Sequence, residues 1–394
     1  MAVNVYGNGT TTASNGANTI THFYDRAGIK AANASAIYSQ FADAKSMPQN
    51  MGKTFKISKW QHIYDLDQNH ADFAAKGFLG KRTLASVTTN LANSGSSGAI
   101  AEGAGAVNQV TPKKITFETA LSRYGFMVEY TDEAVLFSED PVQVKYREEL
   151  GYLVNQANED LIQRDMLSSA GIVINAGGNI TKAQMGTTIT ADGTNEGLYK
   201  VSFDLIRKGV KALVRNRAQR HTEVVDGSTK IGTKPVNKAF YAIVGPEVKF
   251  DLETLTRGTS YEKEYVYVPA YQYAAAANVA EGEIGSMHDV RFIESEGALV
   301  DAGAGSAIPG SYVGTLSNNG TNFDVFPILI PTKGAFATVG LKGQGKVTLY
   351  SKAPSDVNLT NPYGTKGFFS ANMFYASIAL KPECICRINV LATA

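Results

Sequence analysis

The stretch that decides the fold runs from residue 102 to residue 178: EGAGAVNQVTPKKITFETALSRYGFMVEYTDEAVLFSEDPVQVKYREELGYLVNQANEDLIQRDMLSSAGIVINAGG. From Phe117 to Tyr130, apolar side chains alternate with mostly polar ones, which is the period of β-strands. Asp140 and Pro141 then suit the cap and the first position of a helix. The stretch therefore predicts strands followed by one long helix, and it contains no pattern typical of a catalytic site.

The predicted helix runs from about residue 141 to residue 170 and would be about 45 Å long at 1.5 Å per residue. One apolar stripe recurs at helical spacing and consists of Tyr146, Leu150, Leu153, Ala157 and Leu161. Charged side chains occupy much of the remaining surface. A stripe this narrow buries only part of a helix, so we expect the polar faces to meet water or partner surfaces.

Length and composition describe an ordinary globular protein with more than one core. The chain has 394 residues, of which 44% are hydrophobic and 19% charged. A net charge of +1 excludes a polycation built to neutralise phosphates and a strongly acidic, disordered chain. Residues 2–19 lack the features of a signal peptide, and no window approaches the apolar length of a membrane-spanning helix. We expect synthesis in a cytosol, with the protein staying soluble or assembling there.

The two cysteines, Cys384 and Cys386, are too few for a disulfide scaffold and indicate a reducing environment. A zinc site needs four ligands, which this pair does not supply. We expect both to lie on one face of a strand as small core or interface residues.

The chain before residue 102 combines segments that have helical or strand periodicity with polar or small-residue segments that have little or none. Residues 1–19 are polar and predict a mobile arm. Residues 22–45 have helical periodicity, and TFKISKW at residues 54–60 predicts a strand. Residues 61–112 have weak periodicity and many small residues. A loop of this length is usually functional or extends onto a partner.

The chain after the deciding stretch predicts helices and then strands. Ser202 suits the cap of a helix that ends in basic residues, and Gly245-Pro246 opens a second helix after the apolar strand FYAIV. Residues 297–322 are small and polar, which predicts a surface loop or insertion. From Phe323 onward the chain is strand-like, with connections rich in Gly, Pro and Asn. Helices between two strand-rich portions indicate an α+β fold.

Two groups of residues have superficial similarity to chemical sites. Residues 340–346, GLKGQGK, resemble a phosphate-binding loop, but Val347 follows where Ser or Thr is needed, and the next segment predicts a strand. His62 and His70 lie near three aspartates, Asp65, Asp67 and Asp72, at a spacing that matches no metal motif. We interpret the first group as a turn between strands and the second as solvated loop residues.

The most basic stretch comprises Arg207, Lys208, Lys211, Arg215, Arg217 and Arg220. Contact with DNA is a minority interpretation, because the chain is neutral overall and has no docking motif. Nucleophile elbows and zinc-protease motifs are absent from the sequence. We therefore predict no catalytic residues, no cofactor-binding residues and no metal ligands, and we expect that the protein is not an enzyme.

The order of several loose motifs resembles the major capsid proteins of N-four-like tailed bacteriophages, which have the Hong Kong 97-type capsid fold. The supporting segments are IYSQFADAKSMPQNMGKTF at residues 37–55, the deciding stretch, residues 240–252 and 282–294, and the closing NPYGTKGFFSANMFYASIALKPECICRINV. Residues 256–281 and 297–322 depart from this pattern and look like variable insertions.

The resemblance implies a Hong Kong 97-like fold with a peripheral domain, an axial domain, an extended loop, an N-terminal arm and a long spine helix. The implied subdivision is an N-terminal arm at 1–49, an extended-loop region at 50–115, a peripheral domain at 116–200 with the spine helix at about 141–170, an axial domain with insertions at 201–330, and a return to the peripheral domain at 331–394.

The resemblance also implies self-assembly into pentamers and hexamers that form the icosahedral shell around a phage genome. Implied partners are scaffolding, portal and decoration proteins and double-stranded DNA at the inner face, with no membrane. The implied location is the virion, after assembly in the bacterial cytoplasm. Some family members crosslink a lysine to an asparagine, but the sequence does not place Lys76 or Lys81 beside one, so no crosslink is predicted. The alternatives are another phage structural protein, such as a tail tube, and an encapsulin-like bacterial shell protein.

Overall fold

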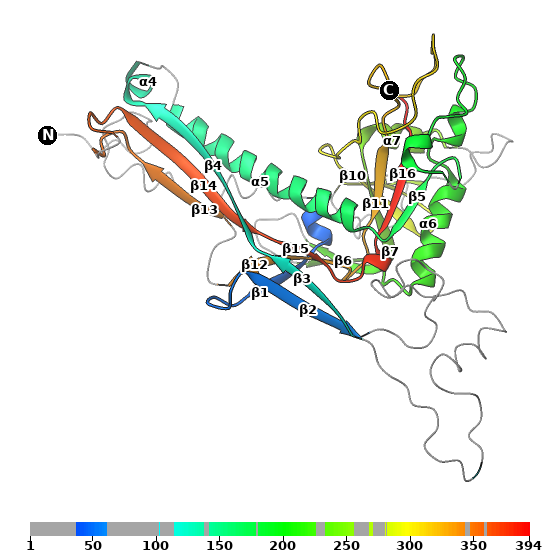
Figure 1. The fold of residues 1–394 in the computed structure, drawn as a ribbon, viewed down its shortest axis with the longest axis horizontal. Helices are drawn as coiled ribbons and strands as arrows, with labels where there is room; N and C mark the ends of the chain where they lie inside the picture. Colours follow the sequence, from blue (N-terminus) through cyan, green and yellow to red (C-terminus); the bar gives the residue numbers. More distant parts are fainter. Residues whose placement is uncertain are drawn as a thin grey trace.

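The computed structural model describes the following residues: 37–60, 102, 114–137, 142–178, 180–225, 233–255, 268–270, 280, 282–342, 347–357 and 361–394. They form two parts, an elongated shaft and a thicker body (Figure 1). The shaft combines helix α5 (Val142–Ser169) with a sheet made of β4 (Ser122–Thr131), β13 (Val347–Lys352) and β14 (Lys366–Tyr375). The body is built on an eight-stranded sheet with α6 (Phe203–Arg215) and α7 (Pro246–Glu253).

Helix α5 has 28 residues and is the long helix predicted from the sequence; the proposed start at Asp140 and Pro141 lies outside the described residues. The predicted stripe is partly wrong. Tyr146 and Leu153 are exposed, whereas the apolar residues of the buried face are Leu150, Val154, Ile162 and Met166. The same buried face includes the polar residues Asn158, Glu159 and Gln163. A search for apolar periodicity misses a face that continues through polar side chains.

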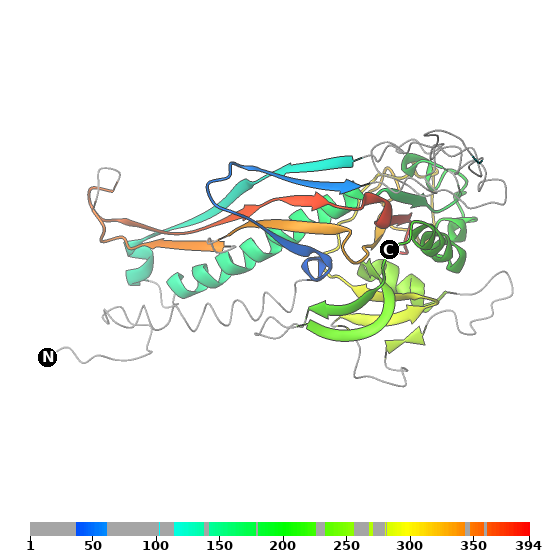
Figure 2. The same cartoon turned by 90° about the horizontal axis from the view of Figure 1, so that it is seen from below.

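The shaft sheet is antiparallel, with β14 in the centre between β13 and β4. Its register places Phe369 opposite Val128 and Ala371 opposite Phe126, on the face that packs against Leu150 of α5. Figure 2 shows α5 lying along one side of these strands. The strand periodicity predicted for residues 117–130 continues through two strands, β3 up to Ala120 and then β4; in β4 it reflects one face covered by α5 and another face turned away from it.

Two smaller sheets join the shaft to the body. Strands β2 (Thr54–Trp60) and β3 (Lys114–Ala120) pair antiparallel, with Trp60 opposite Lys114, which confirms the predicted strand TFKISKW. The second sheet has the order β1 (Asp43–Met47), β12 (Phe336–Leu341) and β15 (Ser377–Ala379). Strand β1 corrects the helical prediction for the end of residues 22–45; residues 22–36 lie outside the described part of the chain.

The body sheet has the order β5, β16, β11, β7, β10, β9, β8, with β6 paired to β7. Its strands are β5 (Ile172–Asn175), β6 (His221–Val225), β7 (Thr233–Val244), β8 (Val268–Pro269), β9 (Glu283–Met287), β10 (Val290–Glu294), β11 (Phe326–Ile330) and β16 (Cys386–Val390). Short helical elements are α4 (Asp132–Phe137), η1 (Tyr38–Phe41), η2 (Lys182–Gln184), η3 (Glu196–Leu198) and η7 (Pro382–Cys384).

The body sheet separates two hydrophobic cores. Phe240 and Ala242 of β7 belong to the core that also contains the buried faces of α6 and α7. Tyr241 and Ile243, which alternate with them along β7, belong to the core that contains Ile162 of α5. Alternating side chains point to opposite faces of a strand, so α6 and α7 cover one face and the end of α5 covers the other.

Several local predictions for the body are confirmed. Ser202 caps α6 by accepting a hydrogen bond from Leu205 N at 3.3 Å, and α7 begins at Pro246. Residues 297–322 form a loop whose residues are mostly exposed or partly exposed, as predicted, and the buried side chain of Leu316 anchors this loop in the body core. Isolated bridges also tie the loop to the body, including Leu316 with Thr393.

Two leucines three positions apart can test which face of α5 packs into the shaft core. Leu150 is 2% exposed in the shaft core, whereas Leu153 is 44% exposed, although the sequence places both in one stripe. We expect Leu150→Ala to lower the free energy of unfolding by about 2–5 kcal/mol because it leaves a cavity. Leu153→Ala should change it by about 0.5 kcal/mol or less. Urea unfolding of the unassembled subunit measures both, and equal losses would contradict the packing described here.

Candidate functional site: anchoring contacts and exposed surfaces

The groups singled out from the sequence do not form a chemical site in the described residues. Within that part of the chain, no group of three or more His, Cys, Asp or Glu side chains is arranged to hold a metal ion. His62, His70 and the neighbouring aspartates lie outside it. Within residues 340–346, Gly340 lies in strand β12, and strand β13 begins directly afterwards at Val347, whereas a nucleotide loop leads into a helix. No helix of the described chain is long and apolar enough to span a membrane.

Both cysteines are free and buried, as predicted, but they do not share one strand face. Cys384 lies in η7 and belongs to the core beneath α5, whereas Cys386 begins β16 and belongs to the core beneath α6. Burial raises the pKa of each thiol to about 12. Both are therefore neutral packing groups near neutral pH and poor nucleophiles.

The first anchoring contact holds the N-terminal end of the described chain on α5. Glu159 of α5 accepts hydrogen bonds from the backbone N–H groups of Tyr38 and Ser39, at 2.9 and 3.3 Å. Gln163, one turn further along α5, accepts from Leu299 N at 2.6 Å and from Tyr38 Oη at 2.8 Å. A carboxylate that accepts two backbone N–H bonds is a strong, charge-assisted contact. Helix α5 thus binds η1 and the 297–299 loop of the body through polar groups.

An aromatic cluster completes this anchor. The Phe41 ring meets the ring of His221 edge-on at 5.2 Å and lies 5.6 Å from Tyr241. His221 Nε2 lies 3.2 Å from the carbonyl oxygen of Pro331. Burial lowers the pKa of His221 to about 4, and the charge of Lys333 acts in the same direction. The imidazole is therefore neutral at physiological pH and donates to Pro331.

The second anchoring contact fixes the β2–β3 pair to the body. Lys59, near the end of β2, forms an ion pair with Glu383 of η7, and the two side chains are 21% and 7% exposed. On the same strand, Lys56 pairs with Glu118 of β3 at 2.8 Å, but both of those side chains are 62% exposed. Of these two ion pairs, Lys59–Glu383 is the one shielded from water, so it holds its geometry more firmly than Lys56–Glu118.

A third contact ties the end of α5 to the strands that connect shaft and body. Asp165 Oδ2 accepts hydrogen bonds from Tyr375 Oη at 2.9 Å and Ser377 Oγ at 2.7 Å. Burial and the Asp165 charge together raise the pKa of Tyr375 above its ordinary value, so the phenol stays a donor. This carboxylate therefore fixes the junction between β14 and β15 on α5.

The shaft carries large apolar side chains that the chain itself leaves exposed. At its tip, Leu136 and Phe137 of α4 are 68% and 86% exposed. On the sheet face turned away from α5, Met127 of β4 and Tyr350 of β13 flank Ser370 of β14 and are also exposed. Exposed apolar side chains that lie close together in this way are typical of surfaces that bind another protein.

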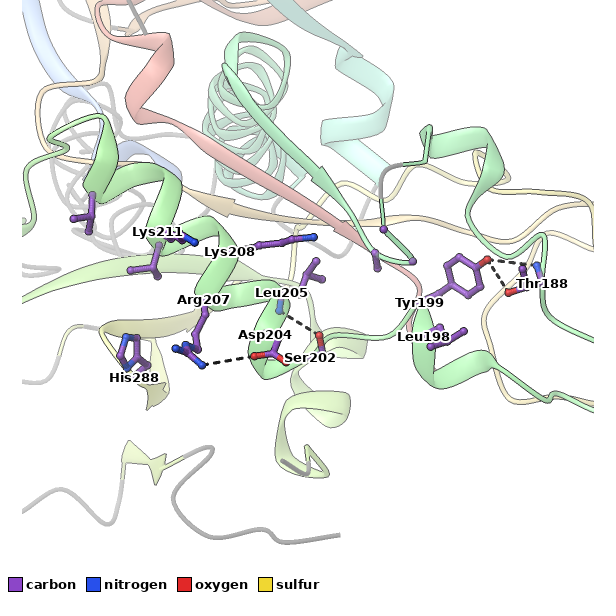
Figure 3. A pocket seen from close by; sticks show the side chains of 15 residues that line it. Thr188, Leu198, Tyr199, Ser202, Asp204, Leu205, Arg207, Lys208, Lys211 and His288 are labelled. Atoms are coloured by element: carbon purple, nitrogen blue, oxygen red, sulfur yellow. Dashed lines mark hydrogen bonds and ion pairs between the residues drawn. The ribbon is translucent and has the colours of Figure 1, made fainter. Parts of the chain in front are cut away.

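The body has a groove of about 860 Å³ along the outer side of α6. Figure 3 shows Arg207, Lys208 and Lys211 projecting from this helix, with His288 nearby on the β9–β10 turn. Of the basic stretch, Arg207, Lys208 and Lys211 therefore line one surface, whereas Arg220 pairs with Asp289. The arrangement offers positive charge and apolar surface.

The anchoring carboxylates are hard to recognise from the sequence. The polar faces of the long helix are expected to meet water or partner surfaces, yet Glu159 is buried, and Glu383 is buried as well. Glu159 lies three and seven positions before Ile162 and Met166, which places it on the buried face of α5. That spacing was a usable signal for Glu159. Nothing in the local sequence around Glu383 indicates that Lys59 lies beside it.

An extended shaft, exposed apolar surfaces and internally fixed junctions define a protein that acts by assembling with others. The chain belongs to the phage capsid protein family, whose model matches residues 114–388. This confirms the resemblance identified from the sequence.

Two kinds of relative support the assignment. The chain is 27% identical over 391 residues to the major capsid protein of Pseudomonas phage KPP21, covering 96% of this chain and 94% of that protein. The capsid of Ralstonia phage GP4 matches with a TM-score of 0.52 and 12% identity, over 91% of this chain and 90% of that chain. The capsid protein of cyanophage P-SCSP1u matches with a TM-score of 0.50 and 11% identity, over 90% and 87%. The fold is the Hong Kong 97-type capsid fold.

The Lys59–Glu383 pair predicts a large difference between two lysines of one strand. Lys59→Met leaves the Glu383 charge buried without its partner, so we expect the free energy of unfolding to fall by about 3–5 kcal/mol. Combining it with Glu383→Met should recover most of that loss. Lys56→Met, in the exposed pair, is the matched control and should have a much smaller effect. Denaturant titration of the unassembled subunits tests this, and similar losses for both lysines would refute the role of Lys59.

His221 predicts a loss of stability in mildly acidic solution. Its pKa is lowered from 6.5 to about 4 in the folded chain, so above pH 6.5 it is neutral in both states and costs nothing. As pH falls from 6.5 towards 4, the unfolded chain takes up the proton first, and folding loses about 3 kcal/mol at most. We expect His221→Phe to flatten the dependence of unfolding free energy on pH between 6.5 and 5. An unchanged slope would show that other groups cause it.

Proposed function

We propose that this chain is the major capsid protein of a tailed bacteriophage and that it assembles into pentamers and hexamers of an icosahedral shell around the genome. The family match over residues 114–388 carries the proposal, because it covers both shaft and body. The relative from Pseudomonas phage KPP21, described as a major capsid protein, aligns over nearly the whole chain and supports the same role.

The exposed surfaces of the subunit support a lattice. The shaft leaves Leu136, Phe137, Met127 and Tyr350 exposed to water, and neighbours in a shell would cover such side chains. Many weak contacts in one lattice together give a stable particle through avidity. The fixed junctions at Glu159, Glu383 and Asp165 suit a subunit that must transmit position between neighbours.

We assign the parts of the subunit as follows. The peripheral domain, at residues 116–200 and 331–394, contains the shaft, with α5 as spine helix. The axial domain near the centre of each ring, at residues 201–330, makes up most of the body, whose sheet also takes in β5 and β16 from the peripheral ranges. Residues 1–49 are the N-terminal arm. Residues 50–115 are the extended-loop region, which reaches a neighbouring subunit.

The proposed partners are further copies of the chain, scaffolding, portal and decoration proteins, and double-stranded DNA held non-specifically at the inner face. The protein would assemble in the bacterial cytoplasm and remain in the virion. Its role is structural and not enzymatic. No cofactor enters this proposal.

The proposal is tested by expressing the chain with and without its scaffolding partner and imaging the products by electron microscopy. Icosahedral shells are the expected result. Tubes would instead support a tail-tube protein, and a discrete small species would contradict an assembly role. Shells of an encapsulin-like protein would have the same architecture, so co-purified phage portal or DNA distinguishes a virus head from a bacterial compartment.

The paired ends of β2 and β3 predict a specific effect on closure of the shell. Trp60 lies opposite Lys114, so a short Gly/Ser linker can replace residues 61–113 without separating the strands. We expect this variant to fold, with an unfolding transition close to that of the natural chain, and to form few or no closed shells. A variant in which residues 61–113 are shuffled keeps the length and composition of the segment but loses its natural sequence, so it is a control for length. Normal shells from the linker variant, seen by electron microscopy, would refute the extended-loop assignment.

A further inference from the structure

The outer face of α6 combines positive charge with exposed apolar side chains. Along the groove, Lys208 and Lys211 form no ion pair with any described residue, whereas Arg207 lies 3.7 Å from Asp204 (Figure 3). Two apolar side chains of the same groove, Leu198 and Val214, are 60% and 48% exposed. The two lysines keep their solvation only while nothing covers the groove, so an occupant must supply negative charge as well as apolar surface.

Helix α7 presents the complementary combination on the same layer of the body. Phe250 is 64% exposed and lies between Glu247 and Glu253, neither of which forms an ion pair with any described residue. The one lysine of α7, Lys249, is neutralised by Glu294 at 2.6 Å. The outward face of α7 is therefore an aromatic side chain flanked by two unpaired acids.

We propose that the groove along α6 receives the outward face of α7 from a second copy of this chain. Phe250 of one copy packs against Val214 of the next, while Glu247 and Glu253 approach Lys208 and Lys211. The inference rests on the proposed function, because it describes how neighbouring bodies meet within a ring. Complementary charge across the contact favours this pairing over two like faces meeting.

The contact is head-to-tail, since α6 and α7 are different surfaces of each copy. A contact of this kind closes into a ring when the rotation that relates one copy to the next is a whole-number fraction of 360°. The helix α7 of the same copy cannot fill the groove, because its Val248 and Leu252 are buried in the core shared with α6. A nucleic-acid backbone would satisfy the lysines but would leave Val214 without an apolar partner.

Disulfide trapping in assembled particles tests the contact directly. The two natural cysteines are buried, so introduced cysteines report alone. We expect the double variant Val214→Cys/Phe250→Cys to give a ladder of linked chains on denaturing gels after mild oxidation of shells. Either single variant should remain monomeric. The pair Val313→Cys/Phe250→Cys, which uses another exposed valine of the body, should also give no ladder.

Charge reversal tests the electrostatic part. Lys208→Glu/Lys211→Glu should reduce the yield of shells by about tenfold or more, because it places like charges across the contact. Glu247→Lys/Glu253→Lys should do the same, and all four changes in one chain should restore assembly. Circular dichroism and urea unfolding of the unassembled subunits check that each variant still folds.

The outcomes separate this inference from the proposed function. If the natural chain forms shells but the Val214–Phe250 pair gives no ladder, the contact is wrong and the capsid role stands. If Lys208→Glu/Lys211→Glu assembles normally and only loses bound DNA, the groove serves phosphates and the inference is overturned. If the natural chain forms no shells under any condition, the proposed function itself fails.

Discussion

One helix shared by two hydrophobic cores is the constraint on which the rest of this structure depends. The first half of α5 places Leu150 and Val154 in the shaft core, and the second half places Ile162 and Met166 in the core beneath the body sheet. A helix transmits rotation from one end to the other, because its hydrogen-bonded backbone does not twist freely. The direction of the shaft relative to the body is therefore set by the packing of α5. Polar contacts at Glu159, Gln163 and Asp165 make that packing specific, since each requires a particular partner.

Much of the fold followed from local patterns in the sequence. The alternation around residues 117–130, the TFKISKW strand and the closing strands are structure that neighbouring residues specify, and they were predicted correctly. The start of α7 at Pro246 and the cap at Ser202 follow from equally local chemistry. The resemblance to capsid proteins rested on the order of such elements. The errors arose where tertiary contacts overrode local preference, as at Asp43, where pairing with Ala337 draws the chain into β1.

The anchoring contacts were not predictable in the same way. Lys59 and Glu383 are far apart in the chain, and a lysine in an alternating strand ordinarily marks a solvated face. The polar composition of residues 297–322 likewise gives no sign that Leu316 is buried and forms a bridge with Thr393. Such features depend on which distant segments meet. A single sequence carries that information only through the fold as a whole. The basic residues of α6 stand out in the sequence, but the groove that they line and the exposed face of α7 are visible only in the structure.

The position of β16 has a consequence for how a subunit is made. This strand lies inside the body sheet, between β5, to which it is parallel, and β11. Every residue between Asn175 and Cys386 must be synthesised before β5 gains its neighbour. The body core, which includes Ile388 and Val390, therefore cannot close on a chain still being translated through this region. Subunits that stop short of β16 would lack a finished core, and so the fold itself keeps incomplete chains out of an assembling particle.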